Sequence, residues 1–114
     1  MNYTGQVVTH HDLHEVDYGE RQDAPRPEDC RTNLEMTTRG LCTGGESIQE
    51  VYDRARRCLA HLRSFSPEET ILVVGHGTFT AMIFAAAEGL QADQLLEYRL
   101  RWGFNNCEVK SLDI

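Results

Sequence analysis

A histidine between two glycines is the group in this sequence best placed for chemistry. Residues 71–74 are an unbroken apolar run, Gly75, His76 and Gly77 follow, and a second apolar stretch begins at Thr78. This order predicts a buried strand, a tight turn and a buried helix. The first N–H groups of such a helix, at Gly77 and Thr78, favour an anion such as phosphate. His76 is then either a catalytic or phosphate-binding group, or a residue that only caps the helix.

Three further histidines lie close together near the N-terminus. His10, His11 and His14 are interspersed with Asp12 and Glu15, and imidazole and carboxylate groups are both zinc ligands. Their spacing matches no ligand motif, so we expect no metal site, and a metal-binding module is kept only as an alternative. The plainer interpretation is a polar strand end that runs into a turn.

The length and composition of the chain indicate a one-domain protein and argue against a nucleic-acid-binding or membrane-spanning one. With 114 residues the chain is long enough for one domain, which we take as residues 1–114. Its formal net charge of −7 argues against a nucleic-acid partner, and no apolar stretch is long enough to span a membrane. The 4 cysteines lack zinc-ligand spacing, and the N-terminus has no signal-peptide pattern. We therefore expect reduced thiols and a cytoplasmic location.

The clearest predicted element is a long amphipathic helix. Over residues 46–65 apolar side chains recur every three or four positions, and Ser47 and Glu50 form a capping box just before this stripe. Charged residues on such a helix usually face solvent. Three arginines are accordingly expected on its solvated faces: Arg54, Arg56 and Arg57.

Shorter elements complete the pattern. Further helices are expected at residues 78–88 and 92–98, with a short one near residues 28–36 of the irregular stretch 21–45. Strands are expected at residues 6–10, 71–74 and 107–114, the last of them after a turn at 103–106. Helices and strands in this order predict an α/β domain in which helices cover a sheet.

Three segments of the chain carry recognisable motifs. Residues 13–20 are Leu-His-Glu-Val-Asp-Tyr-Gly-Glu, residues 45–47 are Gly-Glu-Ser and open the helix with Arg54, and residues 73–77 are Val-Val-Gly-His-Gly. In order and spacing they resemble the Leu-x-Glu-x-x-(Tyr/Phe)-Gly, Gly-Glu-Ser…Arg and second-histidine motifs of the histidine phosphatase superfamily, which has the phosphoglycerate mutase-like fold. Residues 106–109 fit its last strand, so the resemblance covers most of the chain.

The resemblance implies a three-layer α/β fold, with a sheet flanked by helices, and phosphoryl transfer through a phosphohistidine. It implies that His76 is the second histidine, which holds phosphoryl oxygens, and that Glu15 is the acid that protonates the leaving oxygen. Phosphate would be bound by His76, Gly77 and Thr78. The expected partner is a phosphorylated small molecule or a phosphate ion. No metal or other cofactor is implied, because cationic side chains and helix N–H groups balance the charge.

One motif of the superfamily is missing. The sequence contains no Arg-His-Gly, the motif that carries the nucleophilic histidine and its adjacent arginine. That strand and the first helix would lie upstream of Met1, so we expect an incomplete sheet without its first central strand. The chain alone is then expected to be inactive as a phosphatase or mutase, and the alternative is a non-catalytic phosphate-binding or oligomerising remnant. An open central strand is a template for pairing, which predicts a homodimer through the open sheet edge.

Overall fold

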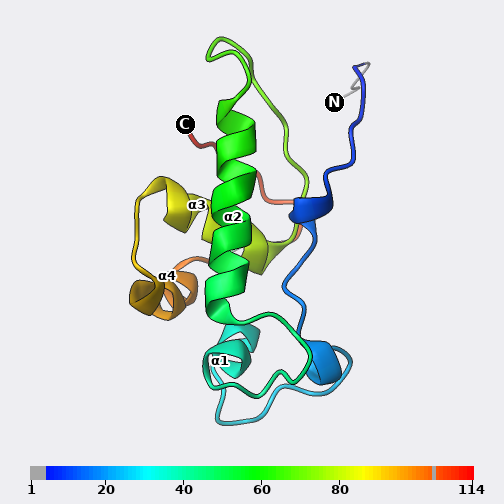
Figure 1. The fold of residues 1–114 in the computed structure, drawn as a ribbon, viewed down its shortest axis with the longest axis vertical. Coiled ribbons are helices and arrows are strands. Elements are labelled where there is room, and N and C mark those ends of the chain that lie inside the picture. Colours follow the sequence, from blue (N-terminus) through cyan, green and yellow to red (C-terminus); the bar gives the residue numbers. More distant parts are fainter. Residues whose placement is uncertain (1–4, 104) are drawn as a thin grey trace.

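Four α-helices make up most of the regular structure in a computed structural model that describes residues 5–103 and 105–114. The longest helix, α2, runs through the centre of the molecule, and the other helices lie around its lower two-thirds (Figure 1). The α-helices are α1 (Asn33–Thr38), α2 (Ile48–Arg63), α3 (Gly77–Ala87) and α4 (Leu95–Arg101). Three short 3₁₀ turns complete the order: η1 (His11–Leu13), η2 (Gly19–Arg21) and η3 (Ala92–Gln94).

Helix α2 forms where the sequence predicts it. The Ser47 side chain accepts a hydrogen bond from the Glu50 N–H, and the Glu50 carboxylate accepts one from the Ser47 N–H. This capping box satisfies two backbone donors that the first turn would otherwise leave unpaired. The predicted long helix is therefore confirmed within two residues at each end, and its apolar stripe lies in the core, including Val51, Ala55 and Leu59.

Helix α3 is apolar on nearly every side, as expected for a helix enclosed by other elements. Its Phe79 and Met82 side chains are fully buried, and its contact with α2 is the most extensive between two helices. Helix α4 packs against α3. The short helix expected at residues 28–36 forms slightly later, as α1, and contributes Leu34 and Met36 to the same core. No described helix is long and apolar enough to cross a membrane.

The predicted α/β fold is wrong for the part of the chain that the structure describes, because no strand or sheet occurs there. The expected strands at residues 6–10 and 71–74 have no regular secondary structure, and the one expected at 107–114 begins in a turn at Cys107 and has none from Glu108 onward. A strand exists only when a neighbouring strand accepts and donates its backbone hydrogen bonds. Residues 70–75 form no such bonds with another described segment. The three-layer sheet flanked by helices is replaced by a helical assembly around α2.

These extended segments leave apolar side chains in solvent. Seven of the nine large hydrophobic side chains that are exposed among the described residues lie on them: Val7, Val8, Ile71, Leu72, Val74, Val109 and Ile114. The run 71–74 was expected to be buried on both faces, yet Val74 is 80% exposed. The expected turn at 103–106 includes Phe104, which lies outside the described residues, and a turn is present at Asn106 and Cys107.

Candidate functional site

His76 lies where the extended segment 70–75 meets α3. It is the N-cap residue of α3, with extended backbone angles, and its side chain makes no capping hydrogen bond. The side chain is exposed, and Gly77 and Thr78 form the first turn of the helix behind it. The predicted helix start is thus confirmed without the strand that was expected to precede it. The ring of His76 is available to a ligand that approaches the helix from solvent.

The carboxylate of Glu15 occupies the N-terminus of α3. Its Oε1 accepts hydrogen bonds from the N–H groups of Phe79 at 3.0 Å and Val16 at 2.9 Å, and its Oε2 accepts one from Thr78 at 3.3 Å. A helix N-terminus carries partial positive charge and unpaired N–H groups, so it stabilises a carboxylate held there. Two of the predicted site residues, Glu15 and Thr78, are therefore in direct contact, and the cap of α3 comes from Glu15 instead of His76.

A tyrosine and an arginine border the same helix start. The Nε of Arg99 donates a hydrogen bond to Thr78 Oγ1 at 3.2 Å, and its Nη1 donates to the Trp102 carbonyl at 2.7 Å. Burial, followed by the negative charge of Glu15, raises the pKa of Tyr18 to about 12. A side-chain hydrogen bond with Thr78 and the positive charge of Arg99 act to lower the same pKa, but they do not outweigh burial, and the phenol of Tyr18 is protonated at neutral pH.

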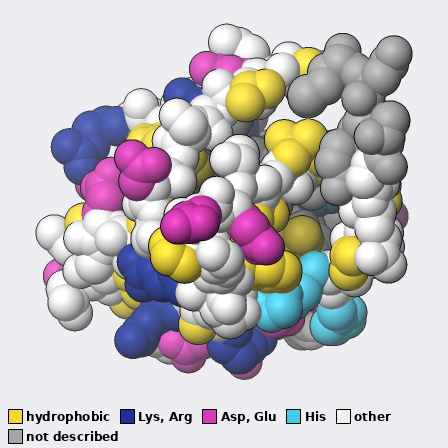
Figure 2. All heavy atoms as spheres, turned by 90° about the horizontal axis from the view of Figure 1, so that it is seen from above, with side chains coloured by type: hydrophobic (Ala, Val, Ile, Leu, Met, Phe, Trp, Pro, Cys, Tyr) yellow, Lys and Arg dark blue, Asp and Glu magenta, His cyan; other side chains and the backbone are white. Residues whose placement is uncertain are grey.

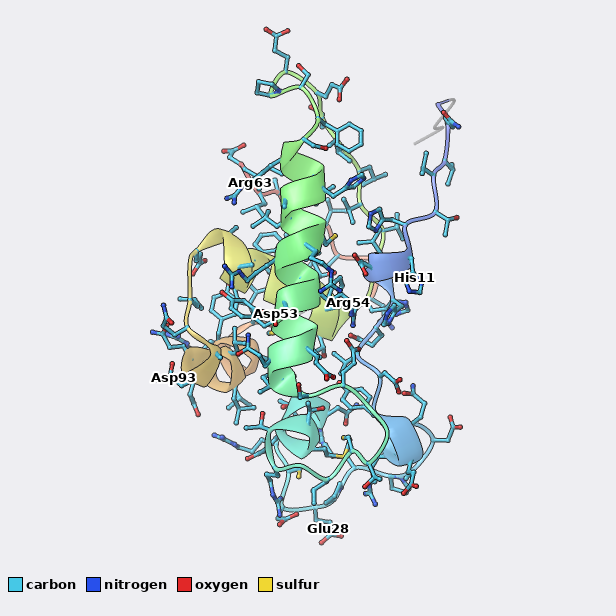
Figure 3. All side chains as sticks on the ribbon, in the orientation of Figure 1. His11, Glu28, Asp53, Arg54, Arg63 and Asp93 are labelled. Atoms are coloured by element: carbon cyan, nitrogen blue, oxygen red, sulfur yellow. The ribbon has the colours of Figure 1, made fainter. Side chains whose placement is uncertain are left out.

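Arg54 holds the segment that carries Glu15 against α2. Its Nη1 donates to the carbonyls of Asp12 and His14, both at 2.8 Å, and its Nη2 donates to the Glu15 carbonyl at 3.3 Å. Its guanidinium also lies 4.0 Å from the centre of the Phe79 ring in α3. The side chain is 4% exposed and points from α2 toward η1 (Figure 3). The expectation that Arg54 faces solvent is wrong, because this arginine links three separate segments.

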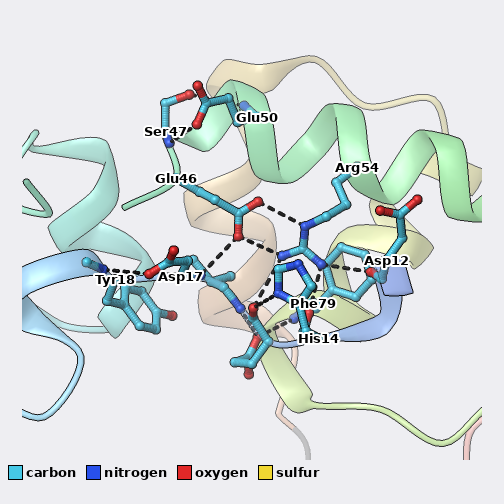
Figure 4. Close-up of polar contacts among 12 residues, drawn as sticks. Asp12, His14, Asp17, Tyr18, Glu46, Ser47, Glu50, Arg54 and Phe79 are labelled. Atoms are coloured by element: carbon cyan, nitrogen blue, oxygen red, sulfur yellow. Dashed lines mark hydrogen bonds and ion pairs between the residues drawn. The ribbon is translucent and has the colours of Figure 1, made fainter. Parts of the chain in front are cut away.

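Glu46 balances the buried charge of Arg54 (Figure 4). Arg54 donates to both carboxylate oxygens, through Nε at 2.9 Å and Nη2 at 2.8 Å, which is the bidentate geometry that favours arginine over lysine. Burial acts to raise the pKa of Glu46, but hydrogen bonds from Arg54 and the Asp17 N–H together outweigh it and lower that pKa. The pair is therefore charged at neutral pH.

Two glycines allow this arrangement to close. Gly19 has φ +55°, and a Cβ on Gly45 would lie 2.5 Å from the Asp17 carbonyl oxygen and 2.7 Å from the Gly19 nitrogen. The two backbone segments also bond to each other, since the Glu46 N–H donates to the Asp17 carbonyl at 2.8 Å. Glycine at position 45 thus lets Glu46 approach Arg54 and Asp17 together.

The N-terminal histidines are spread over separate contacts. His10 Nδ1 accepts from the Asp12 N–H at 3.2 Å, and its ring lies 4.5 Å from that of His61 in α2. The rings of His11 and His14 are 5.7 Å apart. Within residues 5–103 and 105–114, no group of three or more histidine, cysteine, aspartate or glutamate side chains is placed to hold a metal ion.

Comparison with known proteins settles the family. The family model of the histidine phosphatase superfamily (branch 1) matches residues 2–114. The chain belongs to this superfamily. The relationship predicted from residues 13–20, 45–47 and 73–77 is confirmed, and it extends to nearly the whole sequence. No curated protein and no solved structure matches the chain.

In this member of the histidine phosphatase superfamily, the sequence motifs name residues at the start of α3 but not all of the side chains that surround them. Arg54 could have been recognised as buried, because it lies three residues after Val51 and four before Cys58, on the apolar face of α2. Tyr18 belongs to a quoted motif, but its role beside α3 had no signal in the sequence. Arg99 lies 21 residues beyond Thr78, and only the packing of α4 on α3 brings the two together.

Proposed function

We propose that this chain binds the phosphate group of a phosphomonoester at the start of α3, through His76, Gly77 and Thr78. One observation carries the proposal: the N–H groups of Thr78 and Phe79 already hold an anion, the carboxylate of Glu15. A phosphate has the same need for N–H donors and a stronger charge. Membership of the histidine phosphatase superfamily supports phosphatase or mutase chemistry as the function of such a site.

Each residue at the helix start has a role in this proposal. Gly77 has no side chain, so a phosphate oxygen can approach its N–H closely. The exposed imidazole of His76 donates a hydrogen bond to a second oxygen, and Arg99, already bonded to Thr78, supplies positive charge. When phosphate enters, the Glu15 carboxylate moves away from the helix N–H groups, takes up a proton from solvent, and then lies beside the ester oxygen as a proton donor.

We further propose that the chain alone binds phosphate without turnover. The sequence has no Arg-His-Gly motif to provide a nucleophile with its own arginine. Arg54 is the buried arginine nearest to Glu15, and its guanidinium already donates five hydrogen bonds to other groups of the protein, so it does not bind the phosphate. The second candidate is a working phosphatase in which His76 attacks phosphorus, the P–O ester bond breaks, and Glu15 protonates the departing oxygen. Water would then hydrolyse the phosphohistidine.

Titration with inorganic phosphate, followed by the amide NMR signals of Gly77 and Thr78, tests the binding site. Saturable shifts that disappear in His76→Ala support it, with His61→Ala on α2 as the matched control. Absence of saturable shifts in the unmodified chain rules it out. Hydrolysis of a generic phosphomonoester, with acid-labile phosphohistidine that His76→Ala abolishes, would establish the catalytic candidate in place of binding alone.

A further inference from the structure

The extended segment 70–75, between α2 and α3, is an unpaired stretch of backbone with apolar side chains. It descends from the turn above α2 to the start of α3 (Figure 1). Its N–H and C=O groups make no backbone hydrogen bond to another described segment. The segment contains no charged residue. Proteins often place charged side chains on exposed strand-like segments, because such charges prevent another chain from pairing with the backbone. This segment is therefore able to accept a second extended chain.

Side-chain exposure along the segment alternates as it does along a strand. Leu72 is 56% and Val74 80% exposed, whereas Ile71 is 38% exposed and Val73 is half-buried. Alternation with a period of two places Thr70, Leu72 and Val74 on one face. That outer face is apolar, and in an antiparallel pair its side chains would lie directly beside those of the partner strand.

The polar residues on either side of residues 70–75 make this segment complementary to itself, because a carboxylate can accept a hydrogen bond from an imidazole N–H. Glu68 and Glu69 lie before it and His76 follows it. Figure 2 shows acidic, histidine and hydrophobic side chains close together on the end of the molecule seen from above. In an antiparallel pair with a two-fold axis at Leu72, each acidic turn would lie beside the partner's His76. The other two exposed extended segments lack this pattern, since no acidic residue precedes residues 6–10, and residues 107–114 carry acidic and basic residues within the segment.

We propose that two copies of this chain form a homodimer by antiparallel pairing of residues 70–75, centred on Leu72. Leu72 then lies opposite Leu72 of the partner subunit, and Thr70 lies opposite the partner's Val74. A two-fold axis repeats every contact, as is usual for homodimers. The acidic turn of each subunit lies next to the His76 of the other, so the partner's carboxylates compete with phosphate for that imidazole at the proposed phosphate site. The pairing itself does not depend on that site binding phosphate.

Sedimentation velocity over a range of protein concentrations tests whether the chain dimerises through residues 70–75. The unmodified chain should show a concentration-dependent dimer, and Leu72→Lys should abolish it by placing two ammonium groups together at the axis. Leu41→Lys, an equivalent change at an exposed leucine in a different segment, should dimerise like the unmodified chain. A chain that is monomeric up to millimolar concentration, or a dimer unaffected by Leu72→Lys, overturns the proposal.

Cross-linking tests the register. In a Cys107→Ser background, Leu72→Cys should form a disulfide-linked dimer under mild oxidation, because the two Cα atoms face each other across the axis. Val73→Cys should not, because position 73 lies opposite the partner's Ile71. Cross-linking at position 73 but not at position 72 would refute the register.

Charge reversal at Glu68 and Glu69 tests how much the acidic residues before the segment contribute to the stability of the dimer. Glu68→Lys with Glu69→Lys should weaken the dimer by about twofold to thirtyfold, since exposed contacts between a carboxylate and an imidazole contribute modestly and the two-fold axis repeats them. Glu28→Lys with Asp29→Lys, the same change of charge at the opposite end of the molecule (Figure 3), should leave the dimer affinity within error. Equal weakening by both double variants would mean that net charge alone acts, and the complementary register would be wrong.

Discussion

At the scale of single residues, Arg54 determines where the candidate acid lies. Its guanidinium bonds to the carbonyls of Asp12, His14 and Glu15, which fixes the backbone on both sides of the Glu15 side chain. Arg54→Ala should lower the free energy of unfolding by about 3–5 kcal/mol, because it leaves buried acceptors and the Glu46 carboxylate without their cation. Urea denaturation measures this change. Arg57→Ala, at a side chain that is 61% exposed, should cost less than about 1 kcal/mol, and similar losses in the two variants would contradict the role of Arg54.

The Glu46 carboxylate makes stability depend on pH. Its pKa in the folded chain is below the ordinary value of 4.5. Its contribution is therefore fully present above pH 4.5 and is lost as the pH falls through the lower, folded-state pKa. Glu46→Gln should cost about 1.5–3 kcal/mol at pH 7, and should flatten the loss of stability below the ordinary pKa. Thermal denaturation between pH 3 and pH 7 measures both effects, and an unchanged acid profile in the variant would show that other carboxylates dominate.

At the scale of elements, the start of α3 is held by a carboxylate from a distant segment. Glu15→Gln keeps an oxygen acceptor for the helix N–H groups but removes the negative charge, so we expect it to tighten phosphate binding about tenfold, equivalent to about 1.4 kcal/mol. Glu15→Ala should instead destabilise the fold by about 0.5–2 kcal/mol, the usual cost of a lost helix cap. NMR titration and urea denaturation separate the two effects. Asp93→Asn, the same loss of charge on the far side of α2 (Figure 3), should not change phosphate affinity.

The crossing of two loops at Gly45 is a second element-level constraint. A Cβ at this position would come within 2.5 Å of the Asp17 carbonyl oxygen, so the loops must separate. Gly45→Ala should therefore cost about 1–3 kcal/mol, as overpacking usually does, and should shift the amide signals of Asp17 and Glu46. Gly103→Ala, where a Cβ meets nothing within 4 Å, is the matched control in urea denaturation. Equal stability of the two variants would show that the backbone at Gly45 is not tightly packed against Asp17 and Gly19.

An element could be predicted from the sequence when the residues that determine it lie close together along the chain. Helix α2 was found because its apolar period and the Ser47–Glu50 capping box lie within a few residues of each other, and α3 because nearly all of its residues are apolar. The prediction of a strand at residues 71–74 was wrong, because an apolar composition does not tell whether a second strand is present to pair with it. Glu15 and His76 were named as candidate residues from motifs, whereas Arg99 was not, because no local signal reports the packing of α4 on α3. Arg54 was misplaced by its charge, although its position on the apolar face of α2 indicated burial.

At the scale of the whole molecule, a helical core and an extended apolar periphery should differ in local stability. Backbone amides in α2 and α3 are bonded within buried helices, whereas those of residues 70–75 have no backbone partner among the described residues. Hydrogen exchange on the dilute chain should therefore show strong protection in the two helices and near-unprotected rates at 71–74. Raising the concentration should slow exchange at 71–74 alone, because dimerisation would supply the missing acceptors. Slow exchange at 71–74 in the dilute monomer would mean that another segment of the same chain pairs with it, and that the surface proposed for the dimer is already occupied.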